Sequence, residues 1–393
     1  MGGSDLGPGV AILEAPQGGS VIGIATSVAA FVGHSSQGPT DEARQISSWD
    51  EYEGLFGGVD GGEMGYAVSS FYRNGGGEAW VVRAAGPFAS DGLALIGDSA
   101  ARTGLYALEG IDLFNLLSVP DLRRLDSSAH LAVASATAAY CRGRRAFAIL
   151  DLPAGTVTVS DAQAWAATGA PALGHDNTAF AAAYWPEPLI PDALDSNAPR
   201  QIAASGIMAG IYAATDRERG VWEAPAGVAA SMTGVLGVAV KLNDAEQGLI
   251  NPLGLNALRV FPTYGTVPWG ARTLQGADAL ASDWKYVPVR RLALYIEESL
   301  VRGLAWTVFE PNGEQLWASI RLRAESFLVG LWRQGALFGA TSDDAFFVKC
   351  DSTTTTAADI EAGILNVIIG FAAARPAEFL ILRLQLQTEA VGA

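Results

Sequence analysis

Short apolar segments alternate with helical patterns through the first ninety residues. Residues 26–32 (TSVAAFV) form an apolar, β-branched run of strand length, which predicts a buried strand. Residues 48–56 begin with a serine suited to capping and continue with apolar positions at helical spacing, which predicts a helix. A second helix over 65–72 and a compact strand over 79–83 follow. This part of the chain is therefore predicted to be an α/β layer.

From about residue 90 to residue 255 the pattern changes to alanine-rich helices between short apolar strands. Strands are expected at 115–119, 146–150 and 179–184, and a helix over 127–142 joins the first two. A strand, a helix and a following strand typically form a right-handed βαβ unit. This stretch is therefore predicted to be a separate α/β domain.

The remaining third is richer in aromatic residues and arginine and again predicts helices and strands. Helices are expected over 288–303 and 318–332. Strands are expected over 257–261, 307–309, 346–350 and 378–386, and the opening residues 8–14 also alternate like a strand.

Composition points to a chain that buries much of its surface against other protein. The 393 residues are enough for two or three domains. Half of them are apolar and only 17% are charged, which is low for a free monomer. Cys141 and Cys350 lie far apart, so neither a disulfide framework nor a zinc site is expected.

The charge is strongly negative and unevenly distributed. The formal net charge of −16 argues against a nucleic-acid partner, because phosphate binding requires a surplus of lysine and arginine. Residues 1–255 hold 13 basic and 27 acidic groups, whereas residues 256–393 hold 12 and 14. The nearly balanced final third suits packing against protein, and the acidic remainder suits solvent.

No segment predicts membrane insertion or secretion. Residues 224–240 are uncharged but contain a proline and three glycines and are shorter than a spanning helix, so we expect buried core there. The first eight residues lack a basic region and an apolar run. Synthesis in the cytoplasm is expected.

The sequence lacks the usual signatures of catalysis and cofactor binding. His34, His130 and His175 each stand alone, without HExxH or HxH spacing. The chain has no GxxxxGK[ST], no GxGxxG and no GxSxG. We therefore expect no catalytic residue, no metal and no cofactor, and we interpret the chain as a non-enzyme.

An ordered series of unusual segments in the final third resembles the C-terminal domain of contractile phage tail sheath proteins. The segments are residues 256–262, 267–273, 284–292, 296–300, 306–312, 316–317, 335–339, 345–351 and 375–379. The N-terminal segments 8–10, 26–33, 38–39, 74–77 and 80–83 also resemble sheath N-termini.

The resemblance implies an α/β (α+β) fold with extended terminal β arms. It implies an inner domain built from residues 25–89 and 256–377, with an outer α/β domain, residues 90–255, inserted between them. Residues 1–24 and 378–393 would be the linking arms.

The resemblance also implies a function. The chain would be the structural sheath subunit of a phage tail or contractile injection system, forming stacked hexameric rings around an inner tube and contracting to drive the tube through a target envelope. Its partners would be further copies of itself, the tube protein, and baseplate and terminator or cap proteins. Assembly would occur in the bacterial cytoplasm, into a particle that the cell can release.

The family links neighbouring subunits by β-augmentation, in which an arm adds a strand to another subunit's sheet. The resemblance therefore implies that both termini contact other subunits, and it gives residues 356–365 as a tube-facing helix. The arm residues are Val10, Ile12, Leu13, Phe379, Ile381, Leu382 and Leu384, and the tube-facing candidates are Asp359 and Glu361.

Two other classes of protein are compatible with parts of the pattern. The strand and helix alternation over 115–150 is compatible with a soluble α/β enzyme that binds a nucleotide. The apolar stretch 224–240 is the only basis for a membrane-anchored assembly protein. Assembly into polymers would distinguish a sheath from the enzyme, and solubility without detergent would exclude the anchored protein.

Overall fold

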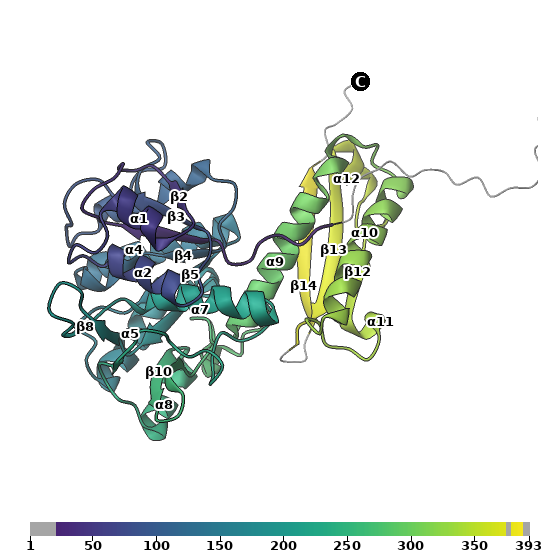
Figure 1. Ribbon diagram of the computed structural model, residues 1–393. Helices are drawn as coiled ribbons and strands as arrows, with labels where there is room; N and C mark the ends of the chain where they lie inside the picture. The colour runs from purple at the N-terminus through teal and green to yellow at the C-terminus, as the bar shows by residue number, and fades with distance from the viewer. Residues whose placement is uncertain (1–20, 375–378, 388–393) are drawn as a thin grey trace, which may run out of the picture.

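The computed structural model describes residues 21–374 and 379–387, which form two units with separate hydrophobic cores (Figure 1). The larger core extends along the chain from Val28 to Leu294, and the smaller one is built mainly from residues 289–373. The helix α9 (Val287–Gly303) joins the units, because its apolar side chains belong to both cores.

The larger unit is built on an eight-stranded mixed sheet with the order β11-β10-β6-β5-β4-β1-β3-β2. The six inner strands are parallel, and the two edge strands β2 and β11 are antiparallel to their neighbours. The central strands β1, β5 and β6 are buried along their whole length, as is usual for a parallel sheet covered on both faces. The strands are β1 (Ala29–Gly33), β2 (Arg44–Ile46), β3 (Ala79–Arg83), β4 (Leu116–Ser118), β5 (Phe147–Asp151), β6 (Ala181–Trp185), β10 (Asn256–Phe261) and β11 (Gly265–Pro268).

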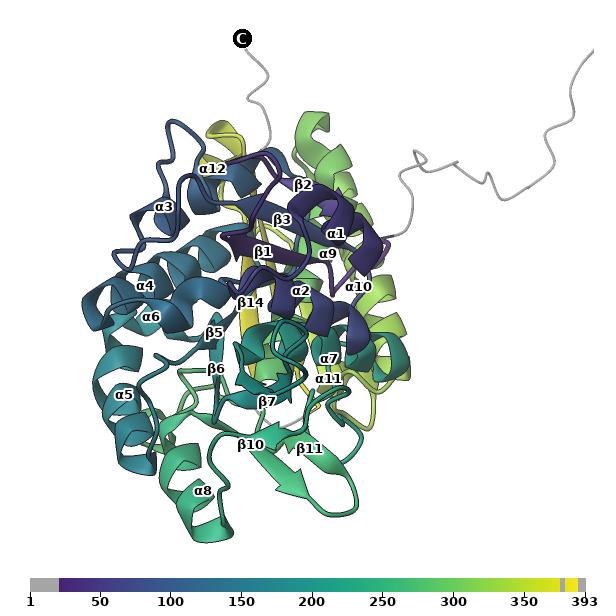
Figure 2. The same ribbon diagram turned by 60° about the vertical axis from the view of Figure 1, so that its left-hand side comes forward.

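Helices cover both faces of this sheet, with α4 and α5 on one side and α2 and α7 on the other (Figure 2). The helices α2 and α7 approach closely because α7 has glycine where the backbones meet. A Cβ on Gly206 would lie 2.4 Å from the carbonyl oxygen of Ala67. The helices of this unit are α1 (Trp49–Phe56), α2 (Met64–Arg73), α3 (Leu93–Ile96), α4 (Ser127–Arg144), α5 (Val159–Ala172), α6 (His175–Thr178), α7 (Ala204–Arg219) and α8 (Asp244–Ile250).

The smaller unit packs two long helices against a three-stranded antiparallel sheet, β12-β13-β14. Ile320, Ala324 and Leu328 of α10 are buried at four-residue spacing against the inward side of this sheet. The elements after α9 are α10 (Glu314–Arg333), α11 (Ser342–Ala345), β12 (Phe346–Lys349), α12 (Ala357–Glu361), β13 (Ile364–Ala372) and β14 (Phe379–Gln387).

Several local predictions are confirmed. Ser48 caps α1 by accepting the backbone N–H of Glu51. The predicted strand 79–83 is β3 without any shift. The predicted βαβ unit is β4, α4 and β5, whose strands are parallel neighbours.

The cores do not follow the domain boundaries expected at residues 89/90 and 255/256. The strand β1 pairs with β3 on one side and with β4 on the other, so residues 25–89 share a sheet with residues 90–255. The strand β10 continues the same sheet beside β6. The boundary between the two cores instead falls within α9, because pairing between distant parallel strands joins the segments that the sequence pattern separates.

Two local predictions are wrong. Residues 307–309 form part of a 3₁₀ helix, η5 (Ala305–Phe309), because the chain turns directly from α9 toward α10. Residues 224–240 are only partly buried, with Val228 and Leu236 exposed. This segment runs along the edge of β11, where Met232 donates its N–H to the carbonyl of Thr266, and ends in the small sheet of β7 (Pro188–Pro191), β8 (Pro199–Gln201) and β9 (Gly237–Val238).

The remaining turns of 3₁₀ helix connect the larger elements. They are η1 (Gly104–Gly110), η2 (Pro120–Arg124), η3 (Asn251–Leu253) and η4 (Asp278–Leu280).

Candidate assembly surfaces

The C-terminal arm residues lie in the edge strand of the smaller sheet. β14 pairs with β13 in an antiparallel ladder of nine residues, which places Phe379 opposite Ala372, Ile381 opposite Gly370 and Leu382 opposite Ile369. Leu384 pairs with Val367 in the same ladder. Within the described residues β14 has no strand on its other side, so that edge is free to accept a further strand.

The N-terminal segment approaches the same unit along α9. Val21 is buried in the smaller core, in contact with Gly303, and Ile24 donates its N–H to the Ser299 hydroxyl at 3.2 Å. Val10, Ile12 and Leu13 lie outside the described residues. The contacts of Val21 and Ile24 therefore place the first described residues of the chain against α9.

The tube-facing candidates Asp359 and Glu361 lie on α12, which is shorter than expected because β13 begins at Ile364. The Asp359 carboxylate accepts the Thr356 N–H and hydroxyl, each at 2.8 Å. These hydrogen bonds hold the pKa of Asp359 below its usual range. Glu361 is exposed. Asp359 therefore caps its own helix, and Glu361 is the more accessible of the two carboxylates.

Buried and half-buried ion pairs join the two units around α9. Arg291 binds Asp216 of α7 through two hydrogen bonds of 2.8 and 2.6 Å, and both side chains are almost fully buried. Arg145 contacts Glu297 and Glu298 at 2.8 and 3.1 Å. The units are therefore joined by polar contacts as well as by shared apolar packing.

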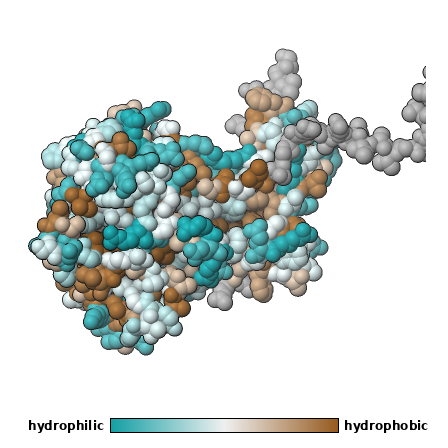
Figure 3. Space-filling view, viewed as in Figure 1, coloured by the Kyte–Doolittle hydropathy of each residue, from teal (hydrophilic) through white to brown (hydrophobic). Residues whose placement is uncertain are grey.

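Exposed apolar side chains are present on both units. Figure 3 shows hydrophobic residues at the waist between the units and in patches among hydrophilic ones. On the smaller unit Phe309 is 80% exposed, and Leu322 and Phe338 are also exposed. Scattered exposed apolar residues are usual on monomers. When a partner covers large aromatic side chains, their apolar surface leaves the water and the complex is stabilised.

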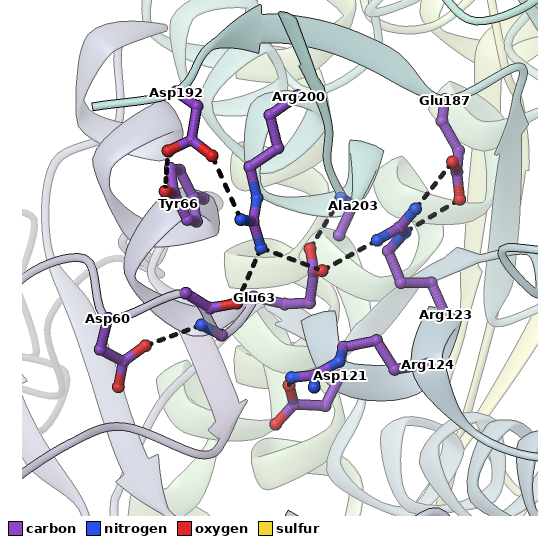
Figure 4. A network of polar contacts seen from close by, with 12 residues as sticks. Asp60, Glu63, Tyr66, Asp121, Arg123, Arg124, Glu187, Asp192, Arg200 and Ala203 are labelled. Atoms are coloured by element: carbon purple, nitrogen blue, oxygen red, sulfur yellow. Dashed lines mark hydrogen bonds and ion pairs between the residues drawn. The ribbon is translucent and has the colours of Figure 1, made fainter. Parts of the chain in front are cut away.

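The carboxyl ends of the parallel strands hold a buried polar network that the sequence analysis did not predict (Figure 4). Arg123 of η2 contacts Glu187 at 2.9 and 2.8 Å and Glu63 at 2.8 Å. Burial lowers the pKa of Arg123, but the two carboxylates outweigh it and raise the pKa overall. Arg200 contacts Asp192 at 3.3 Å, and Asp192 also accepts the Tyr66 hydroxyl.

A nucleotide in a doubly wound sheet binds where the strand order reverses, which here is between β1 and β4. Asp121 occupies that point and is fully buried. Its carboxylate accepts the His34 N–H at 2.7 Å and contacts His34 Nδ1 at 2.8 Å. The His34 N–H, a backbone donor at this point, is therefore already used by a carboxylate. Asp121 after β4 and Asp151 at the end of β5 are visible in the sequence, but their hydrogen-bond donors His34 and Ser205 come from distant segments.

Within residues 21–374 and 379–387, no group of three or more histidine, cysteine, aspartate or glutamate side chains could hold a metal ion. None of the helices in this part of the chain is long and apolar enough to span a membrane.

Comparison with known sequences identifies two matching domains. Residues 96–274 match the phage tail sheath protein central domain, and residues 281–387 match the phage tail sheath C-terminal domain. A putative prophage major tail sheath protein of Pseudomonas aeruginosa (strain UCBPP-PA14) is 29% identical over 297 residues, which are 72% of this chain and 69% of that protein. The tail sheath protein of Vibrio phage KVP40 is 27% identical over 163 residues, which are 41% of this chain and only 23% of that longer protein.

Solved structures resemble the chain over almost its whole length. The PVC sheath complex of an extracellular contractile injection system in the contracted state is 32% identical, with 98% of each chain covered and a TM-score of 0.73. The helical sheath of the anti-feeding prophage in the contracted state is also 32% identical, with 96% of this chain and 98% of that chain covered and a TM-score of 0.75. The ordered segments of the final third, the two matched domains and the shared fold together show that this chain belongs to the phage tail sheath family.

Proposed function

We propose that the chain is the structural sheath subunit of a contractile tail or contractile injection system. The observation that carries this proposal is the similarity of the whole chain, both units and α9 included, to sheath subunits of two contractile particles. The subunits form stacked hexameric rings around an inner tube, and the sheath shortens to drive the tube through a target envelope.

Strand addition is the proposed link between subunits. The free edge of β14 and the N-terminal segment that leaves along α9 support this proposal, since both belong to the smaller unit. Backbone hydrogen bonds along a ladder persist while the bodies that they join rotate. The links therefore survive contraction, whereas the contact with the tube breaks.

The proposed partners are further copies of the chain, the inner tube protein, the baseplate, and a terminator or cap protein. Glu361 and the carboxylate oxygen of Asp359 that accepts neither Thr356 hydrogen bond are candidates for the tube contact. We expect this contact to be electrostatic and small. Assembly takes place in the bacterial cytoplasm, as part of a phage tail or phage-tail-like particle.

The protein works without catalysis in this proposal. The buried Asp121 at the strand crossover argues against the alternative, a nucleotide-binding enzyme, because a carboxylate there repels phosphate. The free energy for contraction comes from contacts between subunits rather than from a cofactor. A small gain in each subunit adds up over many subunits.

Negative-stain electron microscopy of the purified protein, alone and co-expressed with its neighbouring tail genes, tests this function. Hollow, ridged cylinders are expected, because the sheath polymerises around a tube. Uniform small particles in both preparations would contradict the proposal and favour a ligand-binding protein.

A further inference from the structure

Two neighbouring arginines on α9 are both buried, but only one has an acidic partner. Arg291 is 4% exposed and binds Asp216 and the carbonyl of Thr26. Arg290 is 7% exposed, and no hydrogen bond or ion pair joins its side chain to any other described residue. Its guanidinium instead stacks on the rings of Phe180 and Trp284, at 3.9 and 4.2 Å from their centroids.

An arginine buried without a counter-charge is unfavourable. Burial is the main reason that the pKa of Arg290 is lowered to about 10; the negative charge of Glu297 raises the pKa, and the positive charge of Arg142 lowers it by less. Arg291 shows the opposite result, because Asp216 outweighs burial and raises its pKa. The cation–π contacts stabilise the Arg290 side chain but leave its buried Nε–H without a hydrogen-bond partner.

Arg290 lines an open groove at the edge of the larger unit. The groove has a volume of about 520 Å³, which is large enough for the end of a side chain. Both rings lie close to the central carbon of the Arg290 guanidinium. The N–H edge of a guanidinium matches the two oxygens of one carboxylate.

The other charged side chains that line the groove do not pair with the Arg290 guanidinium. Asp176 contacts Arg142 at 3.1 Å, and both side chains are largely exposed. Asp283 is exposed and, like Asp176, forms no ion pair with Arg290. His175 accepts a hydrogen bond from Gln275 through its carbonyl. A carboxylate from outside would therefore meet Arg290 at the wall of the groove and Arg142 at its rim.

We propose that the groove over Arg290 is a carboxylate-binding site that receives an acidic side chain from a second copy of this chain. This inference rests on the proposed function, because it requires the subunits to assemble. Charge favours a second copy as the source, since the chain carries 41 acidic and only 25 basic residues. Each copy thus offers surplus carboxylates, and Arg290 as a buried arginine that can receive one.

Polymerisation of the full-length chain tests the proposal, with Arg290→Gln as the variant and Arg217→Gln as the matched control. Arg217 is an exposed arginine on α7, so its loss changes the net charge equally without touching the groove. We expect Arg290→Gln to need about tenfold more protein to form sedimentable cylinders, because a charge-assisted hydrogen-bond pair is lost. Arg217→Gln is expected to assemble like the wild type.

Sodium acetate provides a second measurement whose main readouts use the wild-type chain and so do not depend on the variant folding. At constant ionic strength against chloride, acetate should inhibit assembly of the wild-type chain, because it occupies the groove. It should also raise the melting temperature of wild-type and Arg217→Gln subunits, but not that of Arg290→Gln.

Each outcome decides a different point. Assembly of Arg290→Gln at the wild-type concentration, or assembly that acetate leaves unchanged, would overturn the second copy as occupant. A melting temperature that acetate does not change would overturn the site itself. If wild-type protein never forms polymers, the proposed function fails and the second-copy occupant with it, while the melting experiment still decides whether the groove binds a carboxylate.

Discussion

Loss of the Asp216 carboxylate should weaken the junction between the two units. Its carboxylate is 3% exposed and is the acidic partner of the buried Arg291. Asp216→Asn leaves that guanidinium without a counter-charge, so we expect a loss of about 3–5 kcal/mol in the free energy of unfolding. Urea denaturation measures the change. Asp244→Asn is the matched control, because Asp244 is 95% exposed in its pair with Arg259 and should cost less than about 1 kcal/mol. Equal effects from both variants would contradict the assignment.

Asp151, the last residue of β5, should make stability depend on pH. Burial raises its pKa to about 7, although Ser205 donates its N–H and its hydroxyl to the carboxylate at 2.9 and 2.5 Å. The folded protein therefore keeps a proton that the unfolded chain loses near its ordinary pKa of 3.8. We therefore expect the contribution of Asp151 to the free energy of unfolding to fall by roughly 1.4 kcal/mol for each pH unit between about 5 and 7, and the fall to end above pH 7.

Asp151→Asn tests this dependence, because an amide keeps the shape and stays neutral. Relative to the wild type, the variant should gain stability as the pH rises from 5 to 7, and the gain should then level off. Chemical denaturation at each pH measures the difference. A difference that stays constant across this range would show that Asp151 is ionised in the folded protein.

At the scale of elements, the sequence predicts what local pattern and capping chemistry determine. The strand 79–83 and the cap at Ser48 follow from residues within one short window. The sheet order does not, because β1 pairs with strands that follow it by about 50 and 87 residues. The unpaired state of Arg290 is equally invisible, since Phe180 reaches it from more than 100 residues away.

Strand β14 should be needed for assembly through its backbone. Proline lacks the N–H that a ladder requires, so Leu382→Pro should block the formation of cylinders, and Val10→Pro and Ile12→Pro should do the same in the N-terminal arm. Leu382→Val is the control, because it keeps the N–H and suits a strand. Sedimentation and negative-stain images give the result. Normal cylinders from all three proline variants would disprove the arm assignment.

At the scale of the whole molecule, α9 should make the two units unfold together. Val287 and Leu294 pack in the larger core, whereas Leu292 and Ile296 pack in the smaller one. The units cannot separate without exposing one of these sets, so a loss in either core weakens both. Leu292→Ala leaves a cavity in the smaller core and should cost about 2–5 kcal/mol.

Hydrogen exchange followed by mass spectrometry distinguishes coupled from independent unfolding. In the Leu292→Ala variant, amides of β5 in the larger unit should lose protection together with those of β13 in the smaller one. The reciprocal variant Val81→Ala, in the larger core, should lower protection in β13 as well. Loss confined to the mutated unit would mean that α9 only tethers the two units. Coupled loss would mean that α9 joins the two units into one cooperative folding unit.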